Sequence, residues 1–345
     1  MTCEPAIKKK YSVQHPEIDN VLFNSNFRYK RIILSVALAA IVLMLMFGAL
    51  PNINLFWREL QNSGHSLLFI IITLLILLLL QDTSKIFRLD PFTLYVTACF
   101  ISLLIGIVIE LVQLSTHSDA SKMDIVRDLA GIIVGLGLYA SFDPELPTSN
   151  LKSNKKMRTG IIILSFCVFT ASMLPLTFLS AAYVQREAVF PVIVDLTANW
   201  TQPFLRLKNA VINSPKNNEI GVDIKDQLTR IEFKPGAYPG VSIIEISPDW
   251  SGYKTFTITI YSEFIQPFNL TLRIHDDQHN YAYTDRFNTK LTVSNGINHF
   301  RIPLEAIMKA PLSRKMNMMR IREIILFSAQ PLEKLHFDVS TMRLE

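Results

Sequence analysis

Long apolar runs fill the first half of the chain, and short stretches that alternate between polar and apolar residues fill the second half. A helix needs roughly 20 mostly apolar residues to cross the hydrocarbon core of a bilayer. Five segments fit or approach this pattern: 32–50, 65–80, 93–115, 125–142 and 160–184. The pattern predicts an α-helical membrane bundle of about five transmembrane helices, with a kink at Pro175 in the fifth.

The second half of the chain predicts an all-β domain. Its short alternating stretches are separated by turn residues such as "SNG", which is typical of antiparallel strands. The predicted strands are "TFTITIYS", "NLTLRIHD", "KLTVSN", "NHFRIPL", "EIILFSA" and "KLHFDVSTMRL". A region of this length fits one jelly-roll sandwich of two packed sheets.

These two patterns divide the chain into five parts. We expect an N-terminal tail (1–31), a four-helix membrane domain (32–142), a basic loop (143–159), a fifth transmembrane helix (160–184) and a β-sandwich domain (185–345). The chain has the three cysteines Cys3, Cys99 and Cys167, and their spacing supports neither a disulfide framework nor a metal site.

Lysine and arginine residues orient the predicted spans. They gather in the N-terminal tail, after the second span and after the fourth span, whereas the other loops carry few of them. Loops rich in these residues stay in the cytoplasm. Five spans then place the N-terminus in the cytoplasm and the β-sandwich outside it. The net charge of +5 and the pI of 9.0 therefore reflect membrane orientation, and we expect no nucleic-acid partner.

Ionisable residues interrupt the apolar pattern between Ile109 and Gly135. A charged group inside a membrane costs at least about 2.5 kcal/mol unless it is paired or hydrated. The helical spacing puts the polar residues of the third and fourth spans on facing stripes, with Arg127 as the partner of Glu110 or Asp128. The small residues Gly131 and Gly135 would let the helix backbones approach closely.

A histidine at the predicted start of the second span extends this cluster. The sequence therefore predicts an outward-facing polar membrane pocket; its candidate residues are His65, Glu110, Gln113, His117, Asp124, Arg127 and Asp128. The alternative is that these residues only lock the packing of the helices.

The same residues resemble the VanZ-like family of bacterial membrane proteins. The shared pattern is a His at the start of one span, an E-x-x-Q helix, a short loop and then D-x-x-x-N-x-x-G-x-x-x-G. His65, Glu110, Gln113, Asp124, Gly131 and Gly135 match it, whereas Asp128 stands where the family usually has Asn. The resemblance covers residues 30–142, and it implies a multi-pass protein of the bacterial inner membrane, with a role linked to glycopeptide antibiotic tolerance.

The β-region resembles galactose-binding-like jelly rolls, the architecture of many carbohydrate-binding modules, over residues 219–345. "DWSGYKTFTITIY", "LRIHDDQHNYAYTDRFN", "INHFRIPLEAI" and "LHFDVSTMRL" carry this resemblance. Sugar sites combine planar polar groups with an aromatic platform, and the second of these stretches contains both. The candidate saccharide-binding residues are Asp276, His279, Tyr281, Tyr283, Asp285 and Arg286. The alternative is a solvated connection held by internal salt bridges.

Three functions remain open from the sequence. The first is an envelope protein that binds a saccharide, which would be a cell-wall component, a lipid-linked precursor or an exopolysaccharide. The second is an intramembrane acid–base enzyme acting on a lipid-linked head group through Glu110, Asp124 and His65. The third is a non-catalytic anchor for envelope assembly. We expect binding rather than catalysis, with no cofactor and no metal. A structural Ca²⁺ held by the many carboxylates is the alternative, although no EF-hand-like spacing appears.

Overall fold

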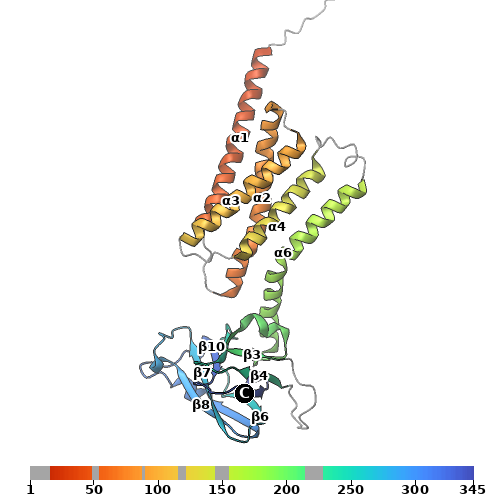
Figure 1. Cartoon of the computed structure of the whole chain (residues 1–345). Helices are drawn as coiled ribbons and strands as arrows, with labels where there is room; N and C mark the ends of the chain where they lie inside the picture. The colour runs from red at the N-terminus through yellow and green to blue at the C-terminus, as the bar shows by residue number, and fades with distance from the viewer. Residues whose placement is uncertain (1–15, 49–53, 88–89, 116–121, 144–154, 214–227) are drawn as a thin grey trace, which may run out of the picture. The chain divides into compact units, whose positions relative to one another are not determined.

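The computed structural model describes residues 16–48, 54–87, 90–115, 122–143, 155–213 and 228–345. The chain forms two compact units, Met1–Leu176 and Thr177–Glu345. The first unit consists of long helices that run alongside one another, and the second contains the strands (Figure 1).

Among the described residues, five helices are long and apolar enough to cross a membrane. They are α1 (Pro16–Phe47), α2 (Leu55–Phe87), α3 (Pro91–Ser115), α4 (Lys122–Phe142) and α6 (Lys155–Val189). The prediction of five long apolar helices is confirmed. Pro175 lies inside α6, which continues past it as one helix.

Helix α2 begins earlier than the sequence predicts. The side chain of Asn54 accepts a hydrogen bond from the backbone N–H of Trp57 at 3.1 Å, which caps the first turn. His65 therefore lies ten residues inside a helix that starts at Leu55, and the prediction that His65 opens the helix is wrong. The apolar residues before His65 extend the helix through the polar segment "NSG".

Helix α2 packs against α1, α3 and α4 around a shared apolar core that includes Phe69, Ile72 and Ile109. Its contact with α4 is close because α4 presents glycines there. A Cβ atom on Gly131 would stand 2.4 Å from the backbone oxygen of Ser66, and one on Gly135 would stand 2.9 Å from Cβ of Thr73. The glycine face of α4 therefore meets α2, rather than the neighbouring helix of the predicted hairpin.

The second unit is an antiparallel β-sandwich of two sheets. One sheet has the order β1-β12-β6-β11-β4-β3, with β9 also paired to β6, and the other has the order β2-β5-β10-β7-β8. The strands of the first sheet are β1 (Val192–Val194), β12 (Met342–Leu344), β6 (Thr255–Ser262), β11 (Leu335–Val339), β4 (Thr229–Phe233), β3 (Ala210–Ile212) and β9 (Gly296–Pro303). Those of the second are β2 (Leu205–Lys208), β5 (Gly240–Ile244), β10 (Ile321–Phe327), β7 (Phe268–Asp276) and β8 (Phe287–Val293).

Buried and exposed side chains alternate along the strands, and the buried ones form the core between the two sheets. In β6 every second side chain is buried, and β7 follows the same period. Trp250 is fully buried and stacks on Phe256, whose ring centroid lies 5.7 Å away. The six predicted strand segments all lie on observed strands, whereas β1 to β5 were not predicted.

Candidate functional site

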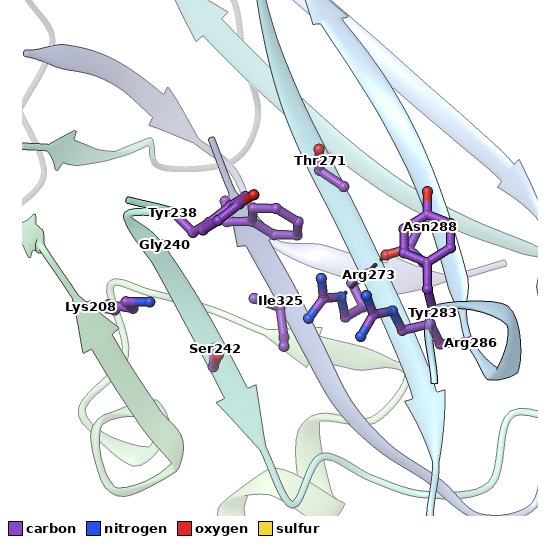
Figure 2. Close-up of a pocket in the computed structure, with 11 residues that line it drawn as sticks. Lys208, Tyr238, Gly240, Ser242, Thr271, Arg273, Tyr283, Arg286, Asn288 and Ile325 are labelled. Atoms are coloured by element: carbon purple, nitrogen blue, oxygen red, sulfur yellow. Dashed lines mark hydrogen bonds between the residues drawn. The ribbon is translucent and has the colours of Figure 1, made fainter. Parts of the chain in front are cut away.

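A cavity of about 550 Å³ lies on the outward face of the second sheet, and we call it the sheet cavity. Figure 2 shows its lining side chains, which come from several neighbouring strands and the turn after β7. The lining residues are Lys208, Tyr238, Gly240, Ser242, Thr271, Arg273, Tyr283, Arg286, Asn288, Ile325 and Phe327. The period of two along each strand sends these side chains outward while their neighbours enter the core.

Two guanidinium groups stand next to each other in the sheet cavity, those of Arg273 and Arg286 (Figure 2). Burial, and then the positive charge of Arg286, lower the pKa of Arg273 below its ordinary value. Arg273 donates through Nε to the side-chain oxygen of Asn288 at 3.2 Å. Buried Nε of Arg286 has no hydrogen-bond partner among the described residues.

Neither arginine is paired with a carboxylate among the residues that the structure describes. The carboxylate of Glu323, on the neighbouring strand β10, acts on Arg273 only through its charge and contacts Nε2 of His275 at 2.9 Å. The cavity therefore presents positive charge that the described part of the domain does not neutralise. A planar anion, such as a carboxylate, is the partner that a guanidinium binds best.

Aromatic rings accompany these charges. The guanidinium carbon of Arg273 lies 4.9 Å from the ring centroid of Phe327, and that of Arg286 lies 5.2 Å from the ring of Tyr283. These distances are within the range of cation–π contacts, which hold each guanidinium in a defined orientation. The rings also offer apolar surface within a polar cavity.

Two of the predicted saccharide-binding residues have a different role. Asp276 and Asp285 are buried, and both carboxylates are bound by Arg314, at 2.5 to 3.0 Å. The backbone N–H of Asn317 also donates to Asp276 at 2.8 Å. These carboxylates are thus occupied by internal partners, and they do not line the sheet cavity.

The other predicted residues of this loop divide into two groups. Nδ1 of His279 lies 2.9 Å from the backbone oxygen of Asp285, and Tyr281 is 90% exposed; neither lines the sheet cavity. Tyr283 and Arg286 do line it. The sequence analysis did not select Lys208, Arg273 and Asn288. Arg273 and Asn288 lie at the two ends of the quoted stretch and pair across β7 and β8, whereas Lys208 lies on β2.

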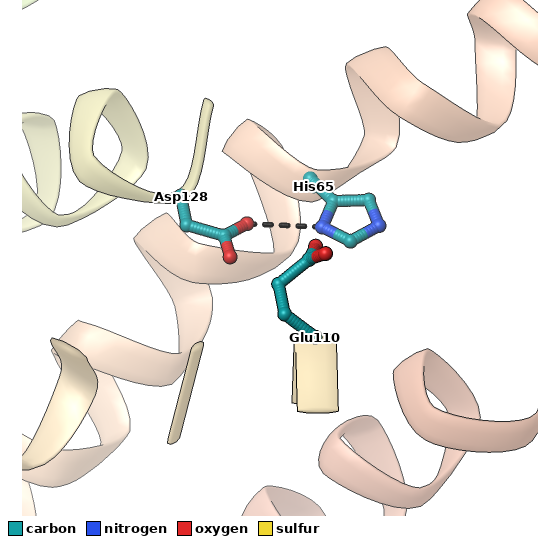
Figure 3. A group of neighbouring side chains, drawn as sticks. All are labelled: His65, Glu110 and Asp128. Carbon is teal, nitrogen blue, oxygen red and sulfur yellow. Dashed lines mark hydrogen bonds and ion pairs between the residues drawn. The ribbon is translucent and has the colours of Figure 1, made fainter. Parts of the chain in front are cut away.

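The helical unit contains a second polar group, formed by His65 of α2, Glu110 of α3 and Asp128 of α4. Figure 3 shows the three side chains converging. Nδ1 of His65 lies 3.0 Å from a carboxylate oxygen of Asp128, and one nitrogen or oxygen atom of each residue lies within 4.8 Å of the others. We call these residues the triad.

Arg127 does not pair with the triad, and the predicted contact of Arg127 with Glu110 or Asp128 is wrong. Its guanidinium donates to Asp124 at 2.9 Å and to Glu59 at 2.5 Å. Glu59 lies on α2 but precedes the predicted span 65–80, so the pattern of apolar segments does not include it. The early start of α2 brings its carboxylate to Arg127.

The remaining predicted pocket residues lie apart from the triad or outside the described residues. Gln113 donates through its side-chain amide to the backbone oxygen of Leu45 in α1, at 2.9 Å. It thus ties α3 to α1. His117 lies outside the residues that the structure describes.

The triad combines one imidazole with two carboxylates in a site closed to solvent. Such a set can accept and donate protons, or it can bind a metal ion through nitrogen and oxygen. Buried oxygens Oε1 of Glu110 and Oδ2 of Asp128 have no hydrogen-bond partner among the described residues. Because buried polar atoms are normally satisfied, these two oxygens mark the triad as a candidate functional site.

Comparison of the chain with protein-family models gives no match, and comparison with curated proteins gives none either. Several solved structures are similar to the C-terminal part of the chain at low sequence identity. One is a family 11 carbohydrate-binding module from Clostridium thermocellum, solved in complex with a β-1,3-1,4-mixed-linked tetrasaccharide. It is 14% identical, with a TM-score of 0.32, over 41% of this chain and 88% of that chain.

Two further similar structures are an exo-β-agarase and a family 30 carbohydrate-binding module of a cellulase from Clostridium thermocellum. The agarase is 14% identical with a TM-score of 0.35, over 41% of this chain and 23% of that chain. The family 30 module is 13% identical with a TM-score of 0.29, over 40% of this chain and 85% of that chain. At these values the functional interpretation depends on the geometry of the sites described above.

Proposed function

We propose that this chain is a multi-pass protein of the bacterial cell envelope whose β-sandwich binds an acidic saccharide in the sheet cavity. The observation that carries the proposal is the adjacent pair Arg273 and Arg286, which has no carboxylate partner among the described residues and stands against aromatic rings. The carboxylate of a sugar acid would accept hydrogen bonds from these guanidinium groups.

The rest of the sheet cavity fits a sugar ring. A pyranose presents apolar C–H groups on its faces and hydroxyls at its edges. The rings of Tyr283, Tyr238 and Phe327 supply apolar surface, and Asn288, Ser242 and Thr271 supply hydrogen-bonding groups. A volume of about 550 Å³ is within the usual range for small-ligand pockets.

Binding of the full-length protein, purified in detergent, to immobilised polyuronate and to a neutral glucan of similar length tests this proposal. We expect binding to the polyuronate that weakens as salt is added, and at least about tenfold weaker binding to the glucan. Arg273→Gln and Arg286→Gln should each weaken polyuronate binding by about tenfold or more, the effect of losing a charged hydrogen bond.

Arg301→Gln is the matched control. Arg301 lies on the other sheet, in β9, and pairs with Glu345 at an exposed position, so its loss removes the same charge without touching the cavity. If Arg301→Gln weakened polyuronate binding as much as Arg273→Gln and Arg286→Gln do, the binding would depend only on net charge. The absence of polyuronate binding, or equal binding to the glucan, would contradict the proposed function.

The membrane part of the proposal is supported by the distribution of side chains in the helical unit. Large apolar residues such as Phe92, Phe100 and Phe166 are exposed on the helices, whereas the triad and Arg127 are buried. A water-soluble helical bundle has the opposite arrangement. Lipid would cover the exposed apolar surface, and the helices would satisfy their backbone hydrogen bonds internally.

The basic loops support a cytoplasmic N-terminus and an extracytoplasmic β-sandwich. This orientation is tested by labelling Leu332→Cys, at an exposed position of the β-sandwich, in a chain whose own cysteines are replaced. A membrane-impermeant maleimide should label it in intact spheroplasts. Labelling only after lysis would place the domain in the cytoplasm and contradict the proposal.

The match of Glu110, Gln113, Asp124, Gly131 and Gly135 to the VanZ-like pattern supports a VanZ-like assignment of the helical unit. A link to glycopeptide tolerance depends on that resemblance alone. It is tested by comparing teicoplanin susceptibility of a deletion strain with that of a strain carrying Glu110→Gln. Unchanged susceptibility in both strains would remove this role.

A further inference from the structure

The triad contains more negative charge than its surroundings compensate. The four buried or half-buried carboxylates at this place are those of Glu59, Glu110, Asp124 and Asp128. Arg127 binds those of Glu59 and Asp124, and His65 contacts that of Asp128. With every carboxylate ionised and the imidazole neutral, the guanidinium of Arg127 leaves three negative charges, two of them in the triad. Such charges are costly inside a membrane unless a cation neutralises them.

The geometry points to a divalent metal ion as that cation. His65, Glu110 and Asp128 come from three different helices, and at 3%, 6% and 3% exposure they are removed from water. One nitrogen or oxygen atom of each lies within 4.8 Å of the others, so small side-chain movements bring all three to metal-binding distance. The unsatisfied oxygens of Glu110 and Asp128 are the atoms that would gain a partner.

We propose that the triad binds one first-row transition metal ion, with Zn²⁺ or Mn²⁺ as the class of ion that fits. An imidazole nitrogen with two carboxylate oxygens suits these ions, whereas Ca²⁺ and Mg²⁺ prefer oxygen ligands alone. Three protein ligands leave a coordination position for water or for an oxygen atom of a bound ligand. The triad is thus a metal centre of the open type, separate from the sheet cavity.

Gly106 of α3 keeps room for this centre. A Cβ atom on Gly106 would stand 3.1 Å from Oδ2 of Asp128 and 3.4 Å from the ring of Phe69. Asp128 therefore occupies the space that a side chain at position 106 would need. Gly106→Ala should displace the Asp128 carboxylate but leave all three ligands in the chain. It therefore tests whether metal binding depends on where that carboxylate lies.

The test is metal binding by the full-length protein purified in detergent and stripped with a chelator. After equilibration with Zn²⁺ or Mn²⁺ and removal of free ion, we expect about one equivalent per chain by elemental analysis. Co²⁺ should give visible absorption bands that Zn²⁺ displaces. Glu110→Gln and Asp128→Asn should each weaken binding by at least about tenfold, and Gly106→Ala should weaken it to a smaller extent.

Asp124→Asn is the matched control. It also replaces a buried carboxylate by an amide, one helical turn before Asp128, but that carboxylate accepts a hydrogen bond from Arg127 and is not part of the triad. It should retain the metal. Without metal, Glu110→Gln should melt at the same temperature as the natural chain or higher, since it removes a buried unpaired charge. Added Zn²⁺ should raise the melting temperature of the natural chain and leave that of Glu110→Gln unchanged.

The absence of stoichiometric metal in the natural chain would overturn the proposal and would mean that protons neutralise the triad instead. The proposal would also be overturned if Glu110→Gln bound metal as tightly as the natural chain, or if Asp124→Asn alone lost metal binding. Should Glu110→Gln fail to fold, the Co²⁺ spectrum of the natural chain decides, because a Co²⁺ bound by stray surface groups lacks the intense bands of a low-symmetry buried site. Saccharide binding is measured separately, so that its failure would leave this result intact.

Discussion

The guanidinium of Arg314 donates to both carboxylate oxygens of Asp276, at 2.5 and 2.7 Å. It also donates to both oxygens of Asp285, at 2.6 and 3.0 Å. One arginine therefore ties the end of β7 and the turn after it to the segment before β10. The turn carries Tyr283 and Arg286, so this ion-pair group holds two residues of the sheet cavity in place.

Arg314→Leu should lower the free energy of unfolding of the β-sandwich by about 3 kcal/mol at pH 7, because two buried carboxylates would lose their charged partner. Urea unfolding followed by tryptophan fluorescence measures this, with Trp200 and Trp250 as reporters in the domain. Arg320→Leu is the control: its ion pair with Asp277 is exposed, and its loss should cost less than about 1 kcal/mol. Equal effects of the two substitutions would contradict the role of Arg314.

The same group makes stability depend on pH in acid. Hydrogen bonds from Arg314 lower the pKa of Asp285 to about 2. Burial raises the pKa of Asp276, but the hydrogen bonds and charge of Arg314, together with backbone N–H groups such as that of Asn317, make the net change downward. Lowered pKa values stabilise the folded state above the ordinary carboxyl pKa, and this stabilisation is lost as the pH falls through the folded-state values. The difference between the natural chain and Arg314→Leu should shrink between about pH 4 and pH 2.

Two tyrosines of the same turn should differ in saccharide binding. Tyr283 lines the sheet cavity beside Arg286, whereas Tyr281 is exposed and lies outside the lining. Tyr283→Ala should weaken polyuronate binding by about tenfold, through lost ring contact and a less ordered Arg286. Tyr281→Ala should leave it unchanged, and a larger effect of Tyr281→Ala in the immobilised-glycan assay would mean that the ligand lies elsewhere.

The glycines of α4 should be sensitive to a single added methyl group. Gly131→Ala places a Cβ against the backbone of α2 at Ser66, and overpacking of this kind costs about 1 to 3 kcal/mol. Thermal unfolding in detergent should therefore show a lower melting temperature. Gly160→Ala in α6 is the matched control, because nothing lies within 4 Å of its added Cβ. A melting temperature unchanged by Gly131→Ala would contradict the close α2–α4 contact.

Arg127 should be more important for stability than either acid that it binds. Arg127→Met leaves the carboxylates of Glu59 and Asp124 without a cation, which should cost about 3 to 5 kcal/mol. Glu59→Gln alone should cost less, because Arg127 keeps Asp124. In the triple variant that also carries Glu59→Gln and Asp124→Asn, most of the loss should be recovered. Thermal melting of the four proteins in detergent measures this coupling, and purely additive losses would refute it.

Local sequence patterns are sufficient to predict the long apolar helices and the strands from β6 onward. The physical reason is that these elements depend on local periodicity and length, because a helix satisfies its hydrogen bonds within its own segment. The strand Thr255–Ser262 was predicted with its observed bounds, since its strict alternation is a local property. Short strands such as Ala210–Ile212 lack that alternation and were missed.

The contacts between polar residues, by contrast, follow from the packing of whole helices and strands. The spacing on α3 and α4 placed Glu110 and Arg127 on polar faces, but the early start of α2 brought Glu59 to Arg127 and left Glu110 with His65 and Asp128. In the β-sandwich, the loop rich in charged residues became an internal ion-pair group. Arg273 and Arg286 lie close together because β7 and β8 form one hairpin, whereas Lys208 joins their cavity from a distant strand. Contacts of this kind depend on the packing of distant segments, and no local pattern encodes them.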